Sequence, residues 1–196
     1  DGGRVGWAPD RDHTLLESEE AVAGERWVGL VGPDGAPVAG FGTEGRVRVP
    51  DERGVVLGVA GGDAVRVATG DAGGLHLWTL TSGPTGWRAT TGSVPVVRLA
   101  AAQTHPGGVD VAADGRSVVW RHRGGHDGNG VTDIAVFGPA GAVRAGFGSR
   151  GGLRMRGTWI PRIQGNGKLV LTAFASDAVR VRRVNADGTA DPSFPV

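Results

Sequence analysis

The stretch VGPDGAPVAGFGTEGRVR at residues 31–48 returns without a gap as FGPAGAVRAGFGSRGGLR at residues 137–154. A third copy begins with VNADG at residues 184–188 and runs to Phe194. Self-similarity at a fixed period is typical of repeat architectures, in which each repeat is one small supersecondary unit. The sequence therefore indicates a repeat protein.

The spacing of one marker phenylalanine gives the period of the repeat. Phe41, Phe147 and Phe194 occupy the same place in the three copies, and they are 106 and 47 residues apart. The first separation is about twice the second, so a degenerate copy is expected between Phe41 and Phe147. Residues 78–87, followed by Gly-Ser-Val at 92–94, fit that place best.

Within each unit, apolar residues alternate with polar ones, as in Arg46-Val47-Arg48-Val49 and Val179-Arg180-Val181-Arg182. Alternation with period two indicates strands with one buried and one solvated face, and the 37 glycines and 11 prolines punctuate the strands as turns. A unit of roughly 47 to 55 residues with three or four strands matches one blade of a β-propeller. The prediction is one all-β domain over residues 1–196, with units at roughly 1–45, 46–92, 93–151 and 152–196.

The two ends of the chain lead to a prediction of closure. The C-terminus stops part-way through the marker, and Asp1-Gly2-Gly3-Arg4-Val5 resembles its missing remainder. An open stack would expose the apolar faces of its end sheets, which repeat proteins avoid by closing or capping. We therefore expect a ring, with the strand near Gly3 in the blade next to Phe194. The ring is either a four-bladed monomer or half of an eight-bladed propeller completed by a second copy.

Two segments also resemble a known family, the bacterial delta-60 β-propeller repeat. They are NGKLV at residues 166–170 and VRRVNADGTADPSF at residues 181–194. The resemblance implies a propeller fold and a bacterial protein in an extracellular or cell-envelope setting. It implies no catalytic residue.

Composition excludes several classes of partner. The 20 acidic and 21 basic side chains nearly cancel, so no net field draws the chain to nucleic acid or to an anionic membrane. No window has the apolar length of a membrane span, which argues against membrane insertion. Cysteine is absent, which excludes disulfides and thiolate chemistry. The chain begins with Asp1, and we interpret it as a mature form or an excised segment. The expected partner is a protein or a surface glycan, and the chain is expected to be a monomer or a homodimer.

Two segments, residues 40–45 and 146–151, match the pattern G-x-G-x-x-G of dinucleotide-binding turns. That chemistry needs a preceding strand and a following helix, whose N-terminus holds the pyrophosphate. Here a Gly/Pro turn precedes each segment and an alternating strand follows it. We interpret the glycines as positive-φ turn residues and expect Phe41 and Phe147 to pack between blades. No cofactor is expected.

One loop carries a candidate metal site. Asp127, Asn129 and Asp133 place oxygen ligands at alternating positions, as a short Ca²⁺ loop would, but a distant bidentate glutamate is missing. A solvated hairpin with Asp-Gly and Asn-Gly turns explains the same residues. His122 and His126, four residues apart in a Gly-rich loop, are not held in ligand geometry as a helix would hold them.

The sequence contains no nucleophile elbow, zinc-protease motif or P-loop, so no enzyme is expected. Six tryptophans leave a lectin-like, carbohydrate-binding propeller as the alternative function. Most of them lie in apolar runs, which favours packing in the core. The strand arginines are interpreted as a solvated face: Arg46, Arg48, Arg154, Arg156, Arg180 and Arg182. The predicted function is a non-catalytic binding or scaffolding propeller module.

Overall fold

The computed structural model describes residues 4–7, 14–17, 25–50, 56–59, 64–70, 75–81, 88–94, 106–124, 130–174 and 178–194. Over these ranges the protein is built from β-strands and turns, with no helix. None of the described segments therefore forms a helix of the length and apolarity that crossing a membrane requires. The prediction of an all-β protein is confirmed for this part of the chain.

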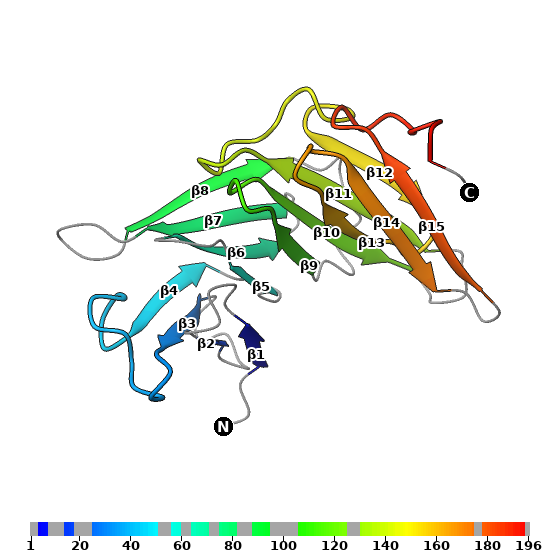
Figure 1. Ribbon diagram of the computed structural model, residues 1–196. Coiled ribbons are helices and arrows are strands. Elements are labelled where there is room, and N and C mark those ends of the chain that lie inside the picture. The colour runs from blue at the N-terminus through cyan, green and yellow to red at the C-terminus, as the bar shows by residue number, and fades with distance from the viewer. Residues whose placement is uncertain are drawn as a thin grey trace.

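The strands form four antiparallel sheets (Figure 1). Sheet 1 contains β1 (Arg4–Trp7), β2 (Thr14–Glu17), β3 (Glu25–Val31) and β4 (Arg46–Pro50). Sheet 2 contains β5 (Val56–Val59), β6 (Ala64–Gly70), β7 (Leu75–Thr81) and β8 (Arg88–Val94). Sheet 3 contains β9 (Pro106–Val111), β10 (Ser117–Arg123), β11 (Val131–Phe137) and β12 (Gly152–Arg156). Sheet 4 contains β13 (Ile160–Ile163), β14 (Leu169–Phe174) and β15 (Val179–Val184).

Each sheet is a meander in which neighbours in sequence are neighbours in space. The first strands of successive sheets are in contact, β1 with β5, β5 with β9 and β9 with β13. Local sequence explains the meander, because apolar residues alternate along short strands and glycine-containing turns reverse the chain.

The third strand of sheets 1, 3 and 4 ends in the same turn. The amide of Gly32 donates to the carbonyl of Ala36, as Gly138 does to Ala142 and Asn185 to Thr189, with N···O distances of 2.8 Å in each case. A glycine with positive φ completes each turn: Gly35 at 76°, Gly141 at 80° and Gly188 at 85°. We call these the tight turns, residues 32–35, 138–141 and 185–188. Residues 78–81 of the expected degenerate copy lie in β7, the third strand of sheet 2, and residues 82–87 are outside the described part.

The core lies between successive sheets. Sheets 1 and 2 enclose Val28, Leu30, Phe41, Val65, Val67 and Leu80. Sheets 2 and 3 enclose Ala68, Leu77, Val109, Val119, Ala135 and Phe137. Sheets 3 and 4 enclose a larger cluster that includes Trp120, Ile134, Phe147, Trp159, Leu169 and Leu171. Each inner sheet therefore buries both faces.

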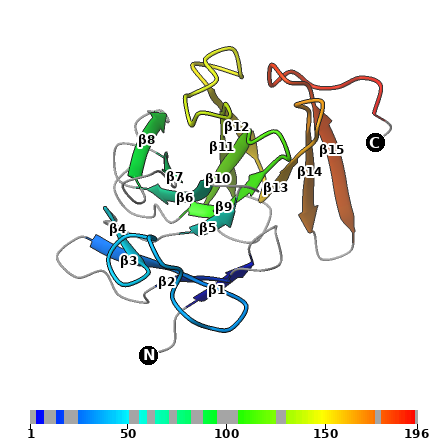
Figure 2. The same cartoon turned by 60° about the vertical axis from the view of Figure 1, so that its left-hand side comes forward.

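The four sheets form an open series, and the expected four-bladed ring is not formed. Figures 1 and 2 place sheet 1 (blue) and sheet 4 (orange to red) at opposite ends, with sheets 2 and 3 between them. The strand near Gly3 was expected beside Phe194. It is β1 and pairs with β2 in sheet 1, so this prediction is wrong. The rotation from one sheet to the next is too small to return to the start after four sheets.

The strand after each marker belongs to the sheet before it. β4 pairs with β3 and β12 pairs with β11, although the sequence units end at residues 45 and 151. The sheets consequently span residues 4–50, 56–94, 106–156 and 160–184.

Candidate binding surfaces

A buried ion cluster lies on the face of sheet 3 that is turned toward sheet 2. Arg121 of β10, Asp133 of β11 and Arg154 of β12 stand directly opposite one another in register. The carboxylate of Asp133 is fully buried, and its oxygens lie 3.3 Å from Arg121 Nε, 2.9 Å from Arg123 Nε and 2.8 Å from Arg154 Nε. Three guanidinium groups therefore converge on one carboxylate.

Arg121 is the fully buried guanidinium of this cluster. Its Nη1 and Nη2 atoms have no hydrogen-bond partner among the described residues. Burial lowers the pKa of Arg121 below its ordinary value, and the charge of Asp133 acts in the opposite direction. Because an unpaired buried charge is costly, Asp133 is essential to holding this guanidinium between two sheets.

The metal site expected at Asp127, Asn129 and Asp133 is only partly within the described residues. Asp133 lies in a strand, and arginines hold both of its oxygens, so a cation there would meet three positive charges. Asp127, Asn129 and His126 lie outside the described part. His122 Nδ1 is 3.2 Å from Thr132 Oγ1. Among the described residues no three His, Asp or Glu side chains come together in a metal-binding group. The loop stays a candidate metal site that the described residues do not test.

The two G-x-G-x-x-G segments are turns, as expected. Gly42, Gly45, Gly148 and Gly151 have positive φ, and strands β4 and β12 follow. Glu44 and Arg150 also have positive φ, at 54° each, which the sequence did not reveal. Phe41 and Phe147 are fully buried between successive sheets, which confirms the predicted packing.

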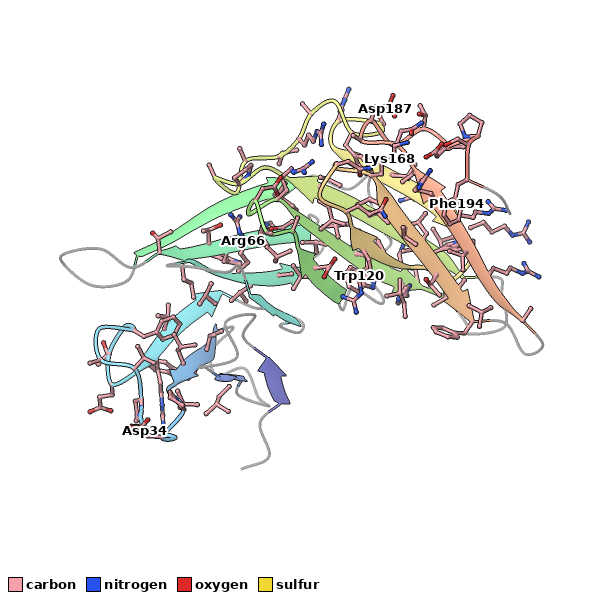
Figure 3. The ribbon with its side chains drawn as sticks, viewed as in Figure 1. Asp34, Arg66, Trp120, Lys168, Asp187 and Phe194 are labelled. Atoms are coloured by element: carbon pink, nitrogen blue, oxygen red, sulfur yellow. The ribbon has the colours of Figure 1, made fainter. Side chains whose placement is uncertain are left out.

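A second charged cluster fixes the chain around Phe194 (Figure 3). Asp191 accepts hydrogen bonds from Lys168 Nζ and Arg183 Nε, both at 2.7 Å. Lys168 contributes most to holding the pKa of Asp191 well below its ordinary value, and Ser193 and Arg183 act in the same direction. The guanidinium of Arg183 also lies over the ring of Phe194, 4.8 Å from its centre. These contacts therefore hold the segment that contains Asp191 and Phe194 against sheet 4.

Among the described residues, three of the four exposed large apolar side chains lie together on one face, and the fourth lies alone on another. Among the described residues the exposed large hydrophobic side chains are Leu16, Phe174, Val179 and Val181. Phe174, Val179 and Val181 lie on the side of sheet 4 that faces away from sheet 3; we call it the outward face of sheet 4. Leu16 pairs with Gly29 on the side of sheet 1 that faces away from sheet 2, the outward face of sheet 1. Both faces end the series of sheets.

The tryptophans with described side chains are mainly core residues. Trp120 and Trp159 are buried, which confirms the expected packing for these two. Trp27 is half-buried on the outward face of sheet 1, where Arg48 lies over its ring at 4.5 Å. Arg182 stacks similarly over Trp159 at 5.3 Å. These arginines and Arg154 thus have specific partners, beyond the solvated face that the sequence predicted.

Comparison with known proteins informs the fold. No protein-family model matches the chain, and no curated protein does. The apo structure of prolyl oligopeptidase B from Galerina marginata is similar over 94% of this chain, with a TM-score of 0.52 and 13% identity. The same enzyme bound to a 35mer hydrolysis and macrocyclization substrate gives a TM-score of 0.48 and 15% identity over 93% of this chain. This chain spans 24% of those solved chains. At 13% identity, the likeness to this peptidase concerns the fold alone.

Proposed function

We propose that this chain is a non-catalytic binding or scaffolding module of the β-propeller type, which holds a protein partner on the outward faces of its end sheets. One observation carries the proposal: the exposed large apolar side chains of the described residues lie on these two faces. Grouped exposed apolar residues mark interaction surfaces, because soluble proteins otherwise keep such patches small.

The arrangement of the sheets supports a propeller. Successive antiparallel meanders pack face to face, and their first strands are in contact, as the innermost strands of propeller blades are. The likeness to part of prolyl oligopeptidase B is in keeping with this interpretation. Because this chain matches 24% of that solved chain, the comparison supports an inference about the fold and none about the activity.

A photoreactive phenylalanine analogue at Val181 tests the proposal. We expect irradiation to cross-link this position to a polypeptide, in the purified protein or in an extract of the source cells. The same analogue at Ala113, an exposed turn residue away from both outward faces, is the matched control and should give no such product. Absence of a cross-link specific to Val181 would contradict the proposal.

Catalysis is tested separately. Incubation of the purified chain with a peptide library should leave the peptides intact. Turnover that persists on further purification would make the chain part of a peptidase and would overturn the non-catalytic half of the proposal.

A carbohydrate ligand is the second candidate, favoured by the position of Trp27. A tryptophan ring on an end face can stack on a sugar, although Arg48 already covers one side of it. A glycan array would give a signal that Trp27→Ala removes if this alternative holds. A blank array would leave the protein partner as the sole candidate.

A further inference from the structure

We propose that the buried ion cluster of sheet 3 is a binding site for an oxyanion, either inorganic phosphate or a carboxylate group. The cluster consists of Arg121, Arg123 and Arg154 around Asp133. It lies between sheets 2 and 3, so the inference does not depend on the outward faces of the proposed function. Three features point to an anion: the net charge of the cluster, the donors of Arg121 and the exposure of the other two arginines.

The cluster carries more positive than negative charge. In the described part of the chain, Asp133 is the only carboxylate that pairs with any of the three arginines. Guanidinium groups stay protonated in proteins, so three positive charges against one negative charge leave a net charge of +2. The neighbouring cross-strand pair on the same face is Val119 and Ala135, which are fully buried and apolar. Such surroundings screen charge weakly, so the excess positive charge attracts an anion.

The terminal nitrogens of Arg121 are the donors that an anion would use. This side chain is fully buried and approaches Asp133 through Nε, at 3.3 Å. Its Nη1 and Nη2 have no hydrogen-bond partner among the described residues. Buried donors without an acceptor are rare in folded proteins, and a bound ion is one arrangement that satisfies them. The paired N–H groups of a guanidinium match two oxygens of a carboxylate or a phosphate.

A second buried arginine shows what the same interface does when protein oxygens are at hand. Arg66 of β6 is also fully buried between sheets 2 and 3. Its Nη1 donates to Thr79 Oγ1 at 3.0 Å, and its Nη2 donates to the carbonyl oxygen of Pro139. Among the described residues only its Nε lacks a partner. The fold therefore supplies acceptors for the terminal nitrogens of Arg66 but not for those of Arg121.

Asp133 orients the arginines without occupying the terminal nitrogens of Arg121. All three guanidinium groups approach its oxygens through Nε, and the contacts from Arg123 and Arg154 are 2.9 Å and 2.8 Å long. A carboxylate would repel a second anion on its own. Here the three arginines outnumber it, so the net field of the cluster stays attractive to an anion.

The other two arginines connect the buried cluster to solvent. The exposed fraction of the side chain rises from 0% for Arg121 to 25% for Arg123 and 43% for Arg154. Arg154 lies on β12, which is an edge strand of sheet 3. An oxyanion that arrives at this edge meets Arg154 first and has further guanidinium groups beyond it.

Calorimetric titration with inorganic phosphate tests the site. We expect the unaltered protein to bind phosphate and Arg154→Gln to weaken the binding about tenfold or more, because a charge-assisted hydrogen bond is lost. Arg154 is changed because its side chain is partly exposed, whereas a substitution of Arg121 disturbs the interior directly. Arg123→Gln is the second variant, with the same expectation. Far-UV circular dichroism verifies that each variant is folded.

Arg162→Gln is the matched control. Arg162 also pairs with an aspartate, Asp110, but it lies outside the cluster and its side chain is 63% exposed. This variant should bind phosphate as the unaltered protein does. All titrations are made at one ionic strength, kept constant with sodium chloride, because salt screens exposed charges.

Melting temperature gives a second measurement. Phosphate stabilises folded proteins in general, so the informative quantity is the difference between variants. The rise in melting temperature with phosphate should be larger for the unaltered protein and Arg162→Gln than for Arg154→Gln. An equal rise in all three would reflect the general effect of the salt and would overturn the proposal.

Sodium acetate in place of phosphate distinguishes the two sources of the oxyanion. Binding of acetate without phosphate would assign the site to a carboxylate group, and binding of phosphate without acetate would assign it to phosphate. Either result supports the site if Arg154→Gln weakens the binding. Binding of neither anion, or equal binding by the unaltered protein and Arg154→Gln, would overturn the proposal and leave the proposed function intact.

Discussion

At the scale of single residues, the most consequential group is the buried carboxylate of Asp133. We expect Asp133→Asn to lower the free energy of unfolding by about 3 kcal/mol or more, because it leaves the charge of buried Arg121 uncompensated. Urea denaturation at neutral pH measures the change.

The matched control is Asp114→Asn. Asp114 also pairs with an arginine, Arg116, but its side chain is 47% exposed. Exposed ion pairs contribute at most about 1 kcal/mol. Equal effects of the two substitutions would show that the buried cluster has no special weight.

Asp191 makes stability depend on pH. Its pKa is lowered in the folded protein, chiefly by Lys168, so its ionised form stabilises the fold fully above the unfolded pKa of about 4. That stabilisation is lost as the pH falls toward the lower folded pKa. The difference in unfolding free energy between the unaltered protein and Asp191→Asn should therefore shrink between about pH 5 and pH 2.

Denaturation curves at several pH values test this dependence, with Lys168→Met as the comparison. That variant loses the largest single cause of the lowered pKa, so its own stability should vary less with pH over the same range. If the difference in unfolding free energy between the unaltered protein and Asp191→Asn stayed constant down to pH 2, the lowered pKa of Asp191 would not be the source of the pH dependence.

Removal of divalent ions is the test of the loop at Asp127, Asn129 and Asp133. Because the oxygens of Asp133 already have arginine partners, a chelator should change the melting temperature little. A loss of many degrees in the presence of a chelator would show that the loop binds a metal.

The sequence predicted the burial of Phe41 and Phe147 but gave no sign of the buried Arg121. The reason is that the two kinds of burial depend on different information. A marker that recurs in a repeat must serve the same local purpose, so its burial follows from the pattern. Arg121 meets Asp133 only through the register of β10 and β11. An alternating strand with arginines has the same appearance whether those arginines face water or a buried carboxylate.

At the scale of elements, the turns after the third strands set the geometry between sheets. Gly42→Ala should destabilise the protein more than Gly40→Ala, although both glycines have positive φ. A Cβ on Gly42 would collide with the backbone carbonyl of Arg46, whereas one on Gly40 would meet nothing within 4 Å. Gly40→Ala should cost only the strain of the left-handed conformation, about 1–2 kcal/mol.

Thermal unfolding of the two alanine variants measures this difference. Equal melting temperatures would show that the turn relaxes around the added methyl group. Serine in place of each glycine extends the test, and the same order is expected.

The strands were predictable because apolar residues alternate between glycine turns, but the edges of the units were not. The alternation in Arg46-Val47-Arg48-Val49 identifies a strand without naming its neighbour. The structure pairs this strand with β3, which precedes it, so each sheet extends past its marker. Which strand it pairs with depends on the direction in which the preceding turn leads the chain. The alternation of apolar and polar residues carries no information about that direction.

At the scale of the whole molecule, far-UV circular dichroism should show a β spectrum with less than about a tenth helix, because strands and turns occupy every described range. A helix content near one third would contradict the fold.

The open series of sheets could not be foreseen from the repeat alone. Counting units gives the number of sheets, but the angle between two sheets depends on the side chains packed between them. Large groups such as Trp120, Phe147 and Trp159 lie between sheets 3 and 4, whereas Ala68 and Ala135 are among those between sheets 2 and 3. A four-bladed ring would need the same angle at every interface between successive sheets, and these two interfaces differ in the size of the side chains they contain.

The last strand, β15, has a consequence for aggregation. It forms one edge of sheet 4 and carries Arg180, Arg182 and Arg183 among its six residues. Positive charge on an edge strand repels an identical strand and so prevents the edge-to-edge growth that leads to fibrils. Salt weakens such repulsion between exposed charges. Concentrated salt therefore removes a safeguard against fibril formation at this edge, while it leaves the apolar contacts between sheet faces in place.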